Sequence, residues 1–73
     1  MKKNYKILIH HPRSGEHWTS LTLELDEQEH IKLRTNIIDV LTDASLYALK
    51  NTYGEYFFPK EFLRECVIKI EEV

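Results

Sequence analysis

The longest regular pattern of apolar and polar residues runs from Asp26 to about Ala44 and predicts an α-helix. At 100° per residue, the apolar side chains of this stretch fall on one half of the helical wheel. They are Ile31, Leu33, Ile37, Ile38, Val40, Leu41 and Ala44. Asp26 and Glu29 have the spacing of a reciprocal helix cap. A helix with one apolar half must lie on another apolar surface, so we expect the rest of the chain to supply a sheet beneath it.

Two alternating runs before the helix predict a β-hairpin. The apolar faces comprise Tyr5, Ile7 and Ile9 on the first run and Leu21, Leu23 and Leu25 on the second. A loop from Pro12 to Glu16 joins the runs, and Gly15 suits a bulge there. Because both apolar faces carry odd-numbered residues, we expect Ile7 opposite Leu21 and His11 opposite His17.

The chain after the helix predicts three further elements. A second hairpin consists of residues 46–50 and 55–58 around a turn at 51–54, and Lys50 faces Glu55 beside that turn. A short helical turn follows over Pro59–Arg64, and a last strand covers Cys66–Glu71. The fold class expected is therefore α+β, with residues 1–73 forming one domain. Its mostly antiparallel five-stranded sheet carries one amphipathic helix on one face.

Length and composition limit the function classes that fit this chain. A core built from 73 residues rarely supplies more than about 3–5 kcal/mol of stability without a staple or a second subunit. Cys66 is the only cysteine, which excludes an internal disulfide and a cysteine-rich zinc site and suits the reducing cytoplasm. No apolar run is long enough to span a membrane. A chain of this size also fits a small accessory protein of the phage or plasmid type.

The second hairpin is apolar on both sides, which a small sheet covered by one helix does not require. Leu46, Ala48 and Phe57 lie on one face, whereas Tyr47, Leu49, Tyr56 and Phe58 lie on the other. Three explanations compete for the aromatic face. The Pro59–Arg64 segment covers it, or a second subunit covers it, or it stacks nucleotide bases. The last explanation is disfavoured because the net charge is −2 and the basic residues are scattered.

The first turn holds the other candidates for chemistry. Arg13 on the loop, beside Trp18, suits contact with an anion or a partner. His11 and His17 could share a metal ion, but metal sites usually need further ligands, so we expect no metal and no cofactor. The sequence contains no recognisable catalytic constellation.

The function expected from the sequence is a non-catalytic protein-interaction or regulatory module. It dimerises through Tyr47, Leu49, Tyr56 and Phe58, and Arg13 and Trp18 add partner contacts. The alternative is a nucleic-acid-binding module that uses the aromatic face and the loop around Arg13.

Overall fold

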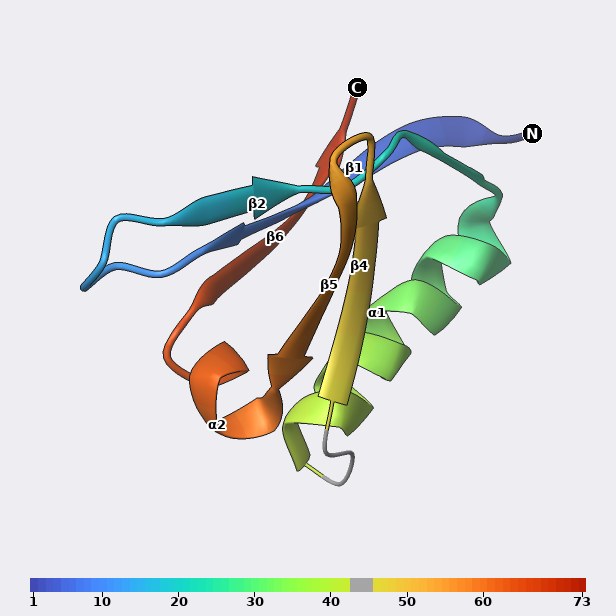
Figure 1. Ribbon diagram of the computed structural model, residues 1–73. Helices are drawn as coiled ribbons and strands as arrows, with labels where there is room; N and C mark the ends of the chain where they lie inside the picture. The colour runs from blue at the N-terminus through green and yellow to red at the C-terminus, as the bar shows by residue number, and fades with distance from the viewer. Residues whose placement is uncertain (43–45) are drawn as a thin grey trace.

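The computed structural model describes residues 1–42 and 46–73 and confirms the α+β class. Six strands and two helices occur in these residues (Figure 1). Their order is β1 (Lys3–His10), β2 (His17–Thr19), β3 (Leu23–Leu25), α1 (Glu27–Thr42), β4 (Leu46–Asn51), β5 (Gly54–Pro59), α2 (Lys60–Leu63) and β6 (Val67–Glu72). The predicted end of the main helix near Ala44 lies outside the described residues.

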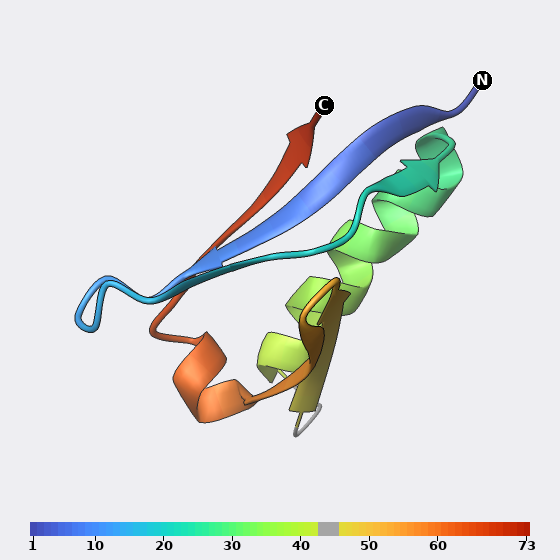
Figure 2. The same cartoon turned by 45° about the horizontal axis from the view of Figure 1, so that its top comes forward.

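The described strands form two antiparallel sheets instead of the single sheet expected. β1 is the central strand of the first sheet, with β6 on one edge and both β2 and β3 on the other. β4 and β5 form the second sheet, and Lys50 faces Glu55 as predicted. Both chain termini lie at the same end of the molecule (Figure 2).

Ser20 explains why the second predicted strand is divided into β2 and β3. The Ser20 Oγ accepts a hydrogen bond from the Ile7 amide at 2.8 Å and donates one to the Leu21 carbonyl at 2.8 Å. A side chain thus replaces the backbone carbonyl that a regular ladder would place opposite the Ile7 amide. β3 keeps the predicted odd-to-odd register, with Tyr5 opposite Leu23.

The register of β2 is shifted by one residue from the prediction. Leu8 pairs with Thr19, and His10 pairs with His17, so the predicted pairing of His11 with His17 is wrong. Leu21 lies at the break and is exposed, whereas the sequence pattern placed it in the core. A one-residue shift reverses which face a strand residue occupies, and the break limits this reversal to the first half of the predicted strand.

The helix α1 begins as predicted but contributes less to the core. The Asp26 carboxylate accepts a hydrogen bond from the Glu29 amide at 2.8 Å, and the Glu29 carboxylate accepts one from the Asp26 amide at 3.0 Å. The first of these bonds lowers the pKa of Asp26, with help from the nearby Lys2. Among its described residues, only Ile37 is buried, and Ile38 is 54% exposed. The prediction that Ile31 and Ile38 face the core is wrong.

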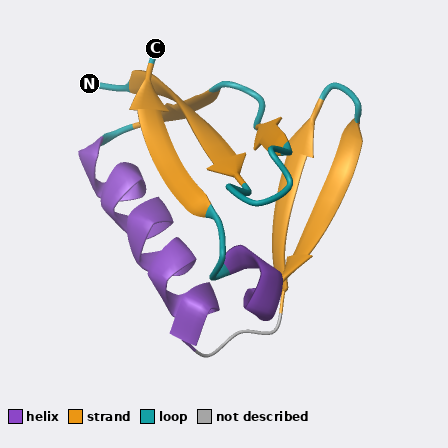
Figure 3. Cartoon of the chain, turned by 90° about the vertical axis from the view of Figure 1, so that its left-hand side faces the viewer, coloured by secondary structure: helices purple, strands orange, loops and turns teal. Residues whose placement is uncertain are grey.

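The core lies between β1 and the second hairpin. It consists of Ile7, Ile9, Leu49, Phe58 and Leu63, and half-buried residues that include Trp18 and Tyr56 pack around it. The helix α2 contacts α1, β4 and β5 and lies between α1 and the hairpin (Figure 3). Its Leu63 is 0% exposed. A four-residue helix has no stability of its own, so this burial holds it in place.

Candidate functional site

An apolar groove between α1 and β6 is the first candidate site. It has a volume of about 480 Å³, within the range of ligand-sized clefts. Its walls are Ile37, Ile38 and Leu41 from α1, Ile68 and Ile70 from β6, and Cys66 just before β6, and its lining also includes His30 and Arg34. Ile68 and Ile70 face α1 because they pair with Ile9 and Ile7, which are buried on that side of the sheet. The groove exists because α1 lies over the sheet without closing against β6.

The outer edge of β6 runs along this groove and is unpaired. Within residues 1–42 and 46–73, β6 pairs only with β1. The Val73 amide donates to the Asn4 carbonyl at 2.9 Å, so the odd-numbered residues of β6 bond to β1. Backbone groups alternate in direction along a strand, which directs those of Ile68, Ile70 and Glu72 to the open edge. An open edge beside an apolar groove is a ready template for another chain.

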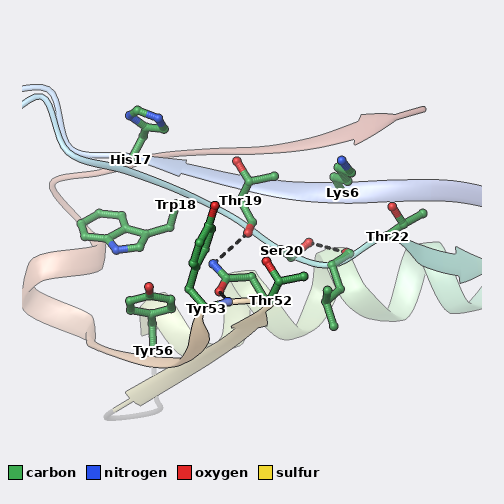
Figure 4. A pocket seen from close by; sticks show the side chains of 11 residues that line it. Lys6, His17, Trp18, Thr19, Ser20, Thr22, Thr52, Tyr53 and Tyr56 are labelled. Atoms are coloured by element: carbon green, nitrogen blue, oxygen red, sulfur yellow. Dashed lines mark hydrogen bonds between the residues drawn. The ribbon is translucent and has the colours of Figure 1, made fainter.

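A second groove lies between β2 and the turn of the second hairpin and has a volume of about 560 Å³. Figure 4 shows the rings of Trp18, Tyr53 and Tyr56 gathered at one end of it, with His17 beside Trp18 on β2 and Lys6 farther along, on β1. Its lining in the described chain contains Lys6 and His17 but no carboxylate. Lys6 is the one lysine or arginine among the described residues of this lining, and it pairs with Glu71 of β6 on the neighbouring strand.

Two hydrogen bonds hold the walls of this second groove together. The Asn51 side-chain amide donates to the Thr19 carbonyl at 3.1 Å, and the Leu21 amide donates to the Lys50 carbonyl at 3.0 Å. Asn51 also accepts from the Tyr53 amide at 2.9 Å, which shapes the turn that carries the exposed Tyr53 ring. These hydrogen bonds thus hold in place the segments that carry the aromatic rings.

His11 forms a third cluster, at the first turn. Its ring stacks on Phe62 with centroids 4.6 Å apart, and it is only 7% exposed. The His11 Nδ1 accepts a hydrogen bond from the Ser14 amide at 3.1 Å, and the Ser14 Oγ lies 3.0 Å from the same nitrogen. The buried Nε2 has no hydrogen-bond partner in the described chain, and the Glu65 carboxylate lies 3.5 Å away. Arg13 lies 3.6 Å from the other oxygen of Glu65.

The His11 cluster has the composition of a serine nucleophile site but not its geometry. The Ser14 Oγ also accepts a hydrogen bond from the Glu16 amide at 3.2 Å, and Ser14 lies exposed on the turn. Neither of the two grooves described above includes Ser14 in its lining. The contacts instead fasten the first turn onto Phe62 of α2 and onto Glu65 in the turn between α2 and β6.

The structure separates the residues predicted to form one partner-binding surface. Leu49 and Phe58 are buried in the core, and the half-buried Tyr47 and Tyr56 border it. The aromatic face of the hairpin points inward, where β1, Trp18 and α2 cover most of it. Leu49 and Phe58 are therefore not free to contact a partner, and only the half-buried Tyr47 and Tyr56 leave part of the predicted patch open in a single chain. The residues exposed on the opposite face of the hairpin are Leu46, Ala48 and Phe57, which the sequence pattern did not single out for contact.

The remaining two predicted site residues have different surroundings. Trp18 packs edge-on against Phe58 at 5.0 Å and Phe62 at 5.9 Å while one side borders the second groove. Arg13 is largely exposed and lies beside Glu65, so part of its charge is offset. Only Trp18 and Tyr56 of the predicted set meet in one groove.

The histidines of the first turn and the single cysteine lie in different surroundings. His10 and His17 face each other on the outer side of the sheet, whereas His11 is turned inward. Within residues 1–42 and 46–73, no three side chains of His, Cys, Asp or Glu gather in a way that would hold a metal ion. Burial, aided by the charge of Glu65, raises the pKa of the Cys66 thiol and disfavours the thiolate.

Sequence reasoning missed the residues around the β6 edge. Lys69 and Glu71 lie on the exposed side of β6, and their charged groups are 3.0 Å apart. Their alternation with Ile68 and Ile70 was visible, but whether β6 occupies an edge or the centre of a sheet depends on contacts that no sequence pattern records.

Comparisons of the chain with protein-family models, curated proteins and solved structures found no match. In the described ranges, neither α1 nor α2 combines the length and the apolar character needed to cross a membrane. The candidate function therefore rests on the geometry of the surfaces described above.

Proposed function

We propose that this protein is a small non-catalytic interaction module that self-associates through the groove between α1 and β6. The observation that carries this proposal is the open edge of β6 beside a groove lined by isoleucines. Exposed apolar surface beside an unpaired strand is a liability in a monomer, and a second copy would cover both features at once. Closed twofold assemblies are the commonest protein oligomers.

The size of the chain supports the same proposal. An interface of ordinary size covers about 800 Å² on each partner, and one copy exposes 5209 Å². A dimer would therefore bury about one seventh of the surface and add stability that the small core lacks. The lone Cys66 is half-buried and has no second cysteine in the chain to pair with, which suits the reducing conditions of the cytoplasm.

Replacement of Ile38 by glutamate is expected to abolish self-association and leave the fold intact. Ile38 is 54% exposed in one copy and borders the groove, so a charge there is solvated in the monomer but buried and unpaired in the dimer. Light scattering at tens of micromolar should report a dimer for the wild type and a folded monomer for Ile38→Glu.

The matched control is Phe57→Glu, because Phe57 is 60% exposed on the outer face of the second hairpin and lies outside the groove. This variant should remain dimeric. A wild-type monomer at the same concentration would refute self-association. A dimer that is lost in Phe57→Glu but kept in Ile38→Glu would place the interface on the hairpin instead.

Binding of a single-stranded nucleic acid in the second groove is a second candidate function. The aromatic rings of Trp18, Tyr53 and Tyr56, together with Lys6 and a lining that includes no carboxylate in the described chain, favour it. Aromatic rings stack on bases and cations neutralise phosphates. One lysine and one histidine supply little charge, which makes this the weaker candidate.

Tyr53 separates this candidate from self-association. If the second groove binds a single-stranded oligonucleotide, fluorescence anisotropy should report binding that weakens as salt is raised. Tyr53→Ala should then reduce affinity by about 1–3 kcal/mol, the usual contribution of one stacked base. Tyr53 is exposed, so the substitution should not affect folding. Absence of binding at low salt would eliminate this candidate.

A further inference from the structure

The open edge of β6 restricts how two copies could pair. Only Ile68, Ile70 and Glu72 direct their backbone groups away from β1, since the odd-numbered residues bond to it. An added strand must form its hydrogen bonds with these three residues. In an antiparallel pair of two β6 strands, the bonded pairs therefore join even-numbered residues to even-numbered residues.

Several antiparallel registers join even-numbered residues to even-numbered residues, and they differ in which charged side chains face each other. A twofold axis at Lys69 would place this lysine opposite its own copy, and an axis at Glu71 would do the same with the glutamate. Like charges directly opposite each other destabilise a strand pair. An axis at Ile70 instead places each Lys69 opposite Glu71 of the second copy, and Ile70 opposite Ile70. Lys69 and Glu71 both lie on the exposed face with their charged groups 3.0 Å apart, so the four charges would alternate in sign.

The strand β1 extends this complementarity. Glu71 pairs with Lys6 of the same copy. In the dimer, each Glu71 would therefore lie between that Lys6 and Lys69 of the second copy. Shorter overlaps, with the axis at Ile68 or Glu72, do not bring Lys69 opposite Glu71. The register centred on Ile70 thus satisfies both the backbone and the charges of the exposed face, and on the groove face it places Ile68 opposite Glu72.

The same twofold axis would also cover the apolar groove between α1 and β6. A twofold axis between two antiparallel strands is perpendicular to their sheet, so both α1 helices would lie on one face and flank the axis. Ile70 from each copy would then meet on the floor between the helices. The exposed Ile38 of each α1 would lie on the walls of this shared channel and be shielded from water.

We propose that two copies join their sheets through antiparallel pairing of β6 with β6 about an axis at Ile70, which places Lys69 opposite Glu71 of the second copy. This inference rests on the proposed function. It specifies the strand that pairs, the register of the pairing and the charged residues that face each other across the interface. The dimer then contains one continuous sheet with β6 strands at its centre.

Charge reversal tests the register directly. In Lys69→Glu, glutamates face glutamates across the axis, and in Glu71→Lys, lysines face lysines. Each variant should self-associate about tenfold more weakly than the wild type at low salt, because two attractive pairs become repulsive. A mixture of the two variants should form heterodimers, and Lys69→Glu combined with Glu71→Lys in one chain should restore the homodimer. Analytical ultracentrifugation measures all four cases, and circular dichroism verifies that each chain is folded.

The outcomes separate this inference from the proposed function. Loss in the single variants and recovery in the mixture and in the double variant would support the register. A wild-type dimer whose single variants associate normally, or whose mixture fails to recover, would overturn the register and leave self-association standing. A wild-type monomer would overturn both the register and self-association. Lys69 would then be a charged residue that protects the open edge of β6 from pairing.

Discussion

Leu63→Ala is expected to destabilise the domain by about 2–5 kcal/mol, the range for truncation of a buried leucine. Leu63 is 0% exposed and belongs to the core cluster with Ile9 and Phe58. A core of this size supplies about 3–5 kcal/mol in total, so the variant should be largely unfolded. Urea denaturation at low micromolar concentration, followed by circular dichroism, measures the change.

Leu46→Ala is the matched control, because it makes the same substitution at a leucine that is 53% exposed. Its free energy of unfolding should change by no more than about 0.5 kcal/mol. Equal losses in the two variants would mean that the outer face of the second hairpin is buried, in contradiction to the structure.

The local features of the fold could be predicted because each depends on neighbouring residues. Alternation along β1 identified its buried residues correctly, and the spacing of Asp26 and Glu29 located the start of α1. Gly54 in the second turn and the pairing of Lys50 with Glu55 followed from turn chemistry. In each case the pattern and its consequence lie within a few residues of each other.

The arrangement of these elements in space could not be predicted, because it depends on which apolar surfaces bury each other. The amphipathic pattern of α1 is real, but β1 and the second hairpin bury each other, so Ile38 is left at the surface. The second hairpin is apolar on both faces, and nothing in its sequence indicates that Leu49 faces inward while Phe57 faces water. These choices are settled by competition between surfaces distant in sequence.

The candidate site illustrates the same limit. Tyr47, Leu49, Tyr56 and Phe58 share a face, as the alternation indicated, but their shared face forms a wall of the core. An apolar face alone does not indicate whether the surface that covers it belongs to the same chain. The groove beside β6 became visible only when the order of strands in the sheet was known.

Ser20 is the clearest case of a residue whose importance depends on its tertiary surroundings. In the sequence it is one of several polar residues in an alternating run, but in the structure its hydroxyl satisfies the buried Ile7 amide. The break that it produces turns the chain so that Leu21 and Thr19 bond to the second hairpin. Ser20 therefore lies where the chain passes from β2 to the bonds that join it to the second hairpin.

Ser20→Ala is expected to cost about 1–3 kcal/mol, the penalty for a buried amide that loses its acceptor. The exposed Thr22 is the matched control, since Thr22→Ala removes a hydroxyl from the same segment and should cost at most about 0.5 kcal/mol. Urea denaturation measures both changes. Hydrogen exchange of the Ile7 amide, followed by NMR, tests the cause, because this amide should exchange faster in Ser20→Ala but not in Thr22→Ala. If the Ile7 amide stays protected in Ser20→Ala, another group has replaced the hydroxyl as its acceptor, and the sheets do not depend on Ser20 for their junction.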